Sequence, residues 1–111
     1  MSMPDKKYFE IKKAFKLWQK KYYNFMTPDL ISLDIFDNNY LIELSRGTGI
    51  NQNIIFGVTV INWFYDKEKK QYMFSVNHKE ELNRCITTTD NTEMHANNYF
   101  DEISNKIKVW K

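Results

Sequence analysis

Two carboxylates, Asp34 and Glu43, are the side chains best suited to acid–base or metal chemistry. They fall on the neighbouring predicted strands 30–36 and 40–45, and sorting side chains by alternation puts both on one face of the sheet. A metal-dependent nuclease would need a lysine two residues after Glu43, where this chain has Ser45. Charged groups on an exposed sheet face more often oppose aggregation. We therefore expect no catalytic residue here.

The segment Arg46-Gly47-Thr48-Gly49 is a weaker candidate, for an anion. Backbone N–H groups in a small glycine-containing loop can form an anion-binding nest, and an arginine and a hydroxyl accompany them here. No Gly-Lys-Ser/Thr follows and the next element is a strand, which excludes the phosphate-binding loop and the dinucleotide fingerprint. A loop that needs glycine for backbone freedom is the simpler interpretation.

Cysteine and histidine offer little chemistry in this chain. Cys85, His78 and His95 are too few and too irregularly spaced for a zinc site, and the sequence does not pair the thiol with a histidine base. We therefore expect no metal and no cofactor. The single cysteine suits a reducing compartment, and no apolar run approaches the ~20 residues that span a bilayer. These features favour a soluble cytoplasmic or otherwise intracellular protein without membrane contact.

Lysines give the start of the chain a charge unlike that of the rest. Residues 1–26 hold seven lysines against two carboxylates, a net charge of +5, whereas residues 27–111 carry a net −3. Four of these side chains share one face of a predicted helix and form what we call the lysine ridge: Lys6, Lys13, Lys16 and Lys20. Such a ridge can follow a phosphate backbone, because each neutralised phosphate releases counterions.

Other features weaken the nucleic-acid interpretation. The ridge lacks arginine, which suits bidentate phosphate and base contacts best. The aromatic side chains of the helix are expected to point to the core, where they cannot stack on bases. No RNA-recognition or helix-turn-helix signature occurs. Nucleic-acid binding through the lysine ridge therefore stands as the second interpretation of function.

The helix that carries the ridge is predicted from Asp5 to about Met26. Pro4 suits its start, and Thr27 before Pro28 ends it, because proline pushes the preceding residue out of the α region. Its apolar residues recur three and four apart and form one stripe: Tyr8, Ile11, Phe15, Trp18, Tyr22 and Phe25.

Four strands are predicted after this helix, and the third is unusual. The run 54–64 is β-branched or aromatic almost throughout and is apolar on both alternating faces, which is typical of a central strand. Short connections to 40–45 and 71–76 predict an antiparallel meander. Asn77 and Glu80 resemble a capping box and predict a short helix through Leu82 and Ile86. Asp90 and Glu93 predict the start of a second helix, whose apolar stripe consists of Tyr99, Ile103, Ile107 and Trp110.

These elements predict one α+β domain over residues 1–111. It would contain an N-terminal helix, a four-stranded antiparallel meander, and one or two C-terminal helices. With all helices packed on the strongly apolar sheet face, the result would be a two-layer sandwich that leaves the second, mixed face open.

The open face is the leading candidate for function. Its predicted apolar anchors and polar rim are Ile55, Ile61, Trp63, Met73, Asp34 and Glu43. Exposed apolar patches rimmed by polar groups usually mark contacts with partners. We therefore expect a non-enzymatic interaction module that binds a protein partner or a second copy of itself. A third interpretation is a small-ligand domain or an enzyme with a pocket near Arg46–Gly49.

Overall fold

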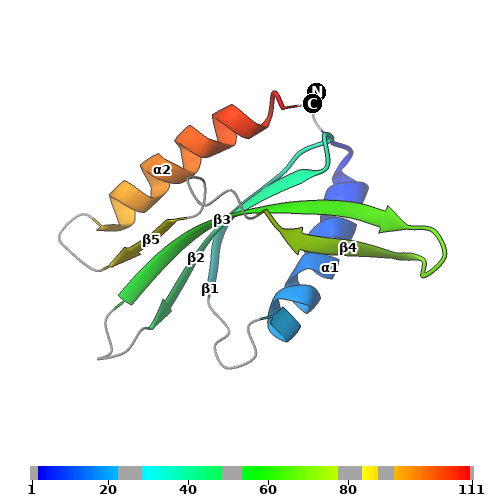
Figure 1. Cartoon of the computed structure of the whole chain (residues 1–111), viewed down its shortest axis with the longest axis horizontal. Coiled ribbons are helices and arrows are strands. Elements are labelled where there is room, and N and C mark those ends of the chain that lie inside the picture. Colours follow the sequence, from blue (N-terminus) through cyan, green and yellow to red (C-terminus); the bar gives the residue numbers. More distant parts are fainter. Residues whose placement is uncertain (1–2, 23–28, 49–53, 78–83, 88–91, 111) are drawn as a thin grey trace.

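The computed structural model describes residues 3–22, 29–48, 54–77, 84–87 and 92–110. Its elements are α1 (Asp5–Tyr22), β1 (Asp29–Ile35), β2 (Tyr40–Thr48), β3 (Ile54–Asp66), β4 (Gln71–Val76), β5 (Arg84–Thr87) and α2 (Thr92–Ile107). Figure 1 shows both helices lying against one twisted antiparallel sheet. The predicted α+β class, with an N-terminal helix, a four-stranded meander and a C-terminal helix on the sheet, is confirmed.

β3 is the central strand, as its composition predicts. It pairs with β2 along one edge, and β4 and β5 share its other edge, with β4 beside 61–66 and β5 beside 55–58. The short helix predicted through Leu82 and Ile86 is wrong where the chain is described, because β5 is a strand. The backbone groups of β3 beyond the end of β4 need hydrogen-bond partners, and β-branched Ile86 and Thr87 suit a strand that supplies them.

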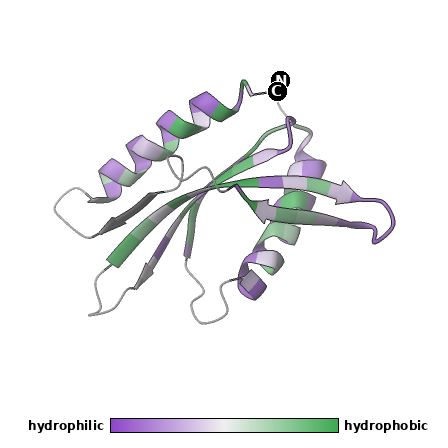
Figure 2. Cartoon of the chain, viewed as in Figure 1, coloured by the Kyte–Doolittle hydropathy of each residue, from purple (hydrophilic) through white to green (hydrophobic). Residues whose placement is uncertain are grey.

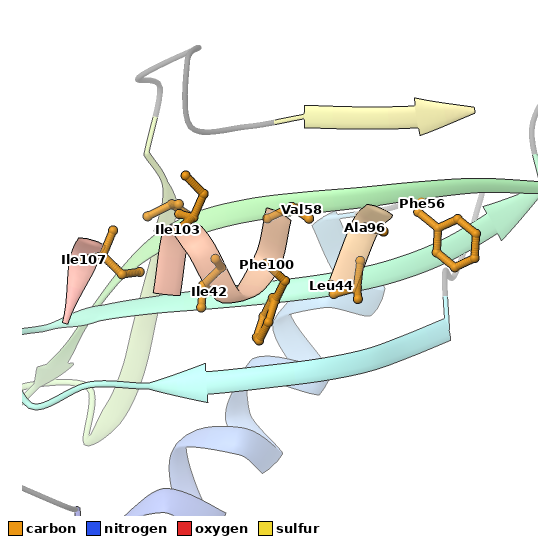
Figure 3. Packing of buried hydrophobic residues seen from close by; sticks show 9 residues of the cluster. Ile42, Leu44, Phe56, Val58, Ala96, Phe100, Ile103 and Ile107 are labelled. Atoms are coloured by element: carbon orange, nitrogen blue, oxygen red, sulfur yellow. The ribbon is translucent and has the colours of Figure 1, made fainter. Parts of the chain in front are cut away.

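α2 covers one face of the sheet. Figure 3 shows its apolar side chains meeting those of β2 and β3. The buried residues of this cluster are Ile42, Leu44, Phe56, Val58, Val60, Ala96, Phe100, Ile103 and Ile107. The predicted stripe of the last helix is therefore confirmed at Ile103 and Ile107.

α1 covers the opposite face, and here the structure differs from the two-layer arrangement. A second buried cluster consists of Ile11, Phe15, Ile35, Leu41, Ile61, Trp63 and Phe74. β3 contributes alternate side chains to the two clusters, so each of its apolar faces has its own helix (Figure 1). Leaving either face in water would expose several large apolar side chains, which explains a three-layer arrangement.

Loop lengths decide which residues of β1 and β4 face α1. The loop 37–39 is closed by a hydrogen bond from the Phe36 N–H to the Tyr40 C=O (2.9 Å), so Ile35 lies opposite Leu41. The loop 67–70 places Phe74 opposite Trp63. β4 and residues 33–35 of β1 are therefore turned over relative to the faces expected from simple alternation, because side-chain direction has a period of two. Ile31, at the irregularity in the β1 register, packs with the cluster beneath α2 instead. Figure 2 shows the charged 67–70 loop as a hydrophilic tip beyond the hydrophobic centre of the sheet.

The β1–β2 turn is tied to the rest of the fold by its asparagines. The Asn38 Nδ2 donates to the carbonyl oxygens of Ile107 (2.7 Å) and Trp110 (2.9 Å), which satisfies the end of α2. Asn39 adopts a positive φ of 69° and its Nδ2 donates to the Trp63 carbonyl (3.0 Å). The Trp63 indole Nε1 donates back to the carbonyls of Phe36 (3.2 Å) and Tyr40 (3.1 Å).

The neighbours Trp63 and Phe64 test the assignment of faces. Trp63 is 4% exposed and Phe64 is 52% exposed. Trp63→Ala should lower the free energy of unfolding by about 3–5 kcal/mol, because it removes a buried ring. Phe64→Ala should change it by about 0.5 kcal/mol or less. Urea denaturation of both variants measures the difference, and a loss under ~1 kcal/mol at Trp63 would contradict the packing of α1 on this face.

Candidate functional site

The face predicted to be open is covered by α1, so that expectation is wrong. Ile61, Trp63 and Glu43 are buried there. Gln19 of α1 is itself buried and donates from its Nε2 to Glu43 Oε2 at 2.7 Å. A buried carboxylate is costly unless it is hydrogen-bonded, so this contact fixes the helix over the sheet rather than presenting the carboxylate to a partner.

The other predicted members of that surface lie elsewhere. Asp34 opposes Ile42 rather than Glu43, and its Oδ2 accepts a 2.7 Å hydrogen bond from the Ser104 Oγ of α2. The sheet therefore separates the two carboxylates that alternation had placed together. Met73 opposes Phe64 and shares neither the face of Trp63 nor its burial. Ile55 is half-buried beside β5, at the end of β3 away from α1.

The predicted anion-binding loop is mostly strand. Arg46, Gly47 and Thr48 continue β2 and pair with β3, so their backbone is extended and cannot curl into a nest. The Arg46 guanidinium forms an exposed 3.5 Å ion pair with Asp29. Gly49 lies outside the described residues.

The cysteine and histidines are not brought together as a site in the described ranges. His95 is exposed on α2, Cys85 belongs to β5, and His78 lies outside the described residues. Within the part of the chain that the structure describes, no group of three or more histidine, cysteine, aspartate or glutamate side chains could hold a metal ion.

The outer face of α1 is strongly basic. All four members of the lysine ridge are exposed. Among the described residues, none of the seven lysines of α1 forms an ion pair. Lys7 instead lies over the Trp63 ring, 5.4 Å from its centroid. The ridge is therefore an exposed, positively charged surface, with the exposed Glu10 as a neighbouring carboxylate.

Two apolar side chains interrupt this basic face. Phe9 is 62% exposed and Leu17 is 57% exposed. Phe9 lies three residues after Lys6 and four before Lys13, spacings that make side chains neighbours on a helix surface. The expectation that every aromatic ring of this helix points to the core is therefore wrong for Phe9, and also for Tyr22 of the predicted stripe, which is 52% exposed. The signal was present in the sequence, because Phe9 falls outside the apolar stripe.

A groove of about 920 Å³ opens beside the first turns of α1. It brings together the beginning of α1, the β1–β2 turn and the residues after α2. Its walls include Tyr8, Phe9, Phe36 and Val109, and its polar lining includes Asp5, Asp37, Asn38 and Lys108. This volume falls within the range of small-molecule sites. No sequence motif pointed to it, because its walls come from three distant segments.

Tyr8 fixes one wall of the groove. Its hydroxyl donates to the Leu33 carbonyl at 3.2 Å, which joins α1 to β1. Burial, and secondarily the Asp34 carboxylate, raise the pKa of Tyr8 above its ordinary value of 10.0. The neutral phenol is the form that donates, so the wall is intact at neutral pH.

This raised pKa predicts a pH dependence of stability. The folded state holds the phenolic proton to higher pH than the unfolded chain, so the contribution of Tyr8 is complete below about pH 10 and is lost as pH rises through the folded pKa. Tyr8→Phe should cost about 0.5–1.5 kcal/mol at neutral pH, and this difference from the unmodified protein should shrink above about pH 10. Urea titrations of both proteins measure it, and a constant difference up to about pH 11 would contradict the assignment.

Comparisons with protein-family models, with curated proteins and with solved structures found no match. None of the described helices is long and apolar enough to cross a membrane.

Proposed function

We propose that this chain is a nucleic-acid-binding module that uses the lysine ridge of α1. The observation that carries the proposal is a row of four exposed lysines without ion pairs to the described residues, on a helix whose opposite side is anchored in the core. Like charges held close together destabilise a helix surface by a few tenths of a kcal/mol per pair. Phosphates that neutralise them would remove this repulsion and release counterions.

The dimensions of the ridge support a phosphate backbone as its ligand. Lys6 and Lys20 are fourteen positions apart, so at a rise of ~1.5 Å per residue the ridge extends over about 21 Å. A backbone that followed it would meet about four ammonium groups. The remainder of the chain, residues 27–111, carries a net −3, which would orient the bound polyanion toward α1.

Charge reversal on the ridge tests the proposal against a matched control. Lys13, Lys16 and Lys20 changed to Glu should abolish binding of a fluorescent oligonucleotide at low salt, because three phosphate contacts become repulsive. Lys67, Lys69 and Lys70 changed to Glu alter net charge equally, on the exposed β3–β4 loop, and should preserve most of the binding. For the unmodified protein, anisotropy titrations from about 50 to 200 mM salt should show, for four phosphate contacts, a log–log slope of about −2.8 with a single strand or about −3.6 with a duplex.

Three results would overturn this function. The unmodified protein could fail to bind any oligonucleotide at low salt. Alternatively, the loop variant could lose binding as completely as the ridge variant, which would mean that net charge alone attracts the ligand. Equal binding of polyglutamate would indicate an acidic protein as the partner instead.

A second candidate, association with a protein partner or a second copy, is favoured by the β3–β4 hairpin. This hairpin extends beyond α1 in Figure 1. Phe64 is largely exposed and opposes Met73, and β4 is an edge strand of the described sheet with no charged residue. Uncharged edges invite pairing with another strand, so a second copy is the partner this edge fits best.

Light scattering separates this second candidate from a monomer. Phe64→Lys should convert a dimer to a monomer, because it places a charge at the centre of the proposed contact. Met94→Lys changes a side chain that is also 52% exposed, but on α2, and should leave the mass unchanged. A monomeric unmodified protein at high concentration would exclude the self-association.

A further inference from the structure

We infer that the groove beside α1 receives one unstacked base of a single-stranded nucleic acid whose phosphates lie on the lysine ridge. The inference rests on the proposed function and adds the class of nucleic acid. Its basis is the position of Phe9, which belongs to both surfaces. Phe9 neighbours Lys6 and Lys13 on the helix, and it also forms part of the groove wall.

Aromatic side chains give the groove its affinity for a flat ring. Phe9 exposes most of its ring, and the Tyr8 ring supports it edge-on, with centroids 5.6 Å apart. Phe36 lies in the same groove, and Val109 is an exposed apolar residue there. Bases of single strands stack on exposed aromatic rings, whereas the bases of an intact duplex are already stacked on each other. An aromatic ring within a row of lysines therefore favours a single strand.

The charges of the two surfaces favour a base in the groove and phosphates on the ridge. Asp5, Asp37 and Lys108 line the groove, which gives it two carboxylates and one ammonium group. Neither carboxylate forms a hydrogen bond or an ion pair with the described residues. Carboxylates repel phosphate but accept hydrogen bonds from the exocyclic amine of a base. The ridge next to them consists of four lysines, and the exposed Glu10, four residues after Lys6, is a single carboxylate beside it. A strand bound in the opposite sense, with phosphate in the groove, would place like charges together.

Asn38, a polar residue of the groove lining, is held by hydrogen bonds within the protein. Both N–H groups of Asn38 are used by the carbonyls of Ile107 and Trp110, so this side chain holds the shape of the groove and does not read the base. Recognition then depends on the ring of Phe9 and the free carboxylates. Cytosine, with its exocyclic amine and small ring, is a suitable probe.

A comparison of two strands tests the base separately from the phosphates. One probe is oligo-deoxycytidine of about 12 nucleotides, a length within the site sizes of single-strand binders, and the other is an abasic strand of the same length. The unmodified protein should bind the oligo-deoxycytidine about tenfold more tightly. Phe9→Ala should remove this preference and leave binding of the abasic strand within about twofold, because the lysine contacts persist.

Two further variants serve as controls for the role of the Phe9 ring. Phe9→Leu keeps apolar bulk at this position but lacks a ring, so it should lose the preference as Phe9→Ala does. Leu17→Ala changes an equally exposed apolar side chain of the same helix that does not line the groove, and it should keep the preference. Thermal unfolding followed by circular dichroism confirms that each variant is folded.

The outcomes separate failure of the base-binding groove from failure of the proposed function. Equal binding of both strands by the unmodified protein, with binding still abolished by the ridge reversal, would overturn the base-binding groove and leave the proposed function standing. Preference for duplex over either single strand would do the same. Absence of binding to both strands at low salt would overturn the proposed function and the groove together.

Discussion

The apolar character of β3 on both faces is the constraint on which the rest of the structure depends. Alternate residues of this strand enter two separate cores, one beneath α2 and one beneath α1. Burying a large apolar side chain contributes about 1.5–3 kcal/mol, so neither face can remain in water without losing much of the stability of a small domain. Two helices on opposite sides are the simplest way to bury both faces within 111 residues.

The position of α1 links this constraint to the candidate function. Its inner side is fixed by Phe15 in the core, by the Gln19–Glu43 hydrogen bond and by the Tyr8 hydroxyl on β1. These contacts fix the rotation of the helix about its axis, because each attaches the same side to the sheet. The lysine ridge and Phe9 are thereby held outward in a single arrangement. A surface held in this way loses little conformational freedom when it binds a ligand.

Much of the fold could be predicted from local patterns, whereas the sheet face on which each side chain lies could not. The stripe of α1, the central position of β3 and the stripe of α2 are all periodic features of short segments. The error for Asp34 and Glu43 was one of strand register, since pairing across the 37–39 loop puts Leu33 and not Asp34 opposite Glu43. The lysine ridge could be read from spacing alone. The groove could not, because its walls are far apart in the chain.

The sequence by itself determined the types of the main elements, the charge of α1 and the apolar character of both faces of β3. These properties depend on residues that are close together in the chain. Within a helix or a strand, the backbone geometry alone fixes which of these side chains share a face. Only the tertiary structure decided which helix covers which face, that Trp63 lies beneath α1, and that Phe9 borders a groove. The reason is that side chains alternate with a period of two along a strand, so a single residue in a distant loop reverses every contact that follows it.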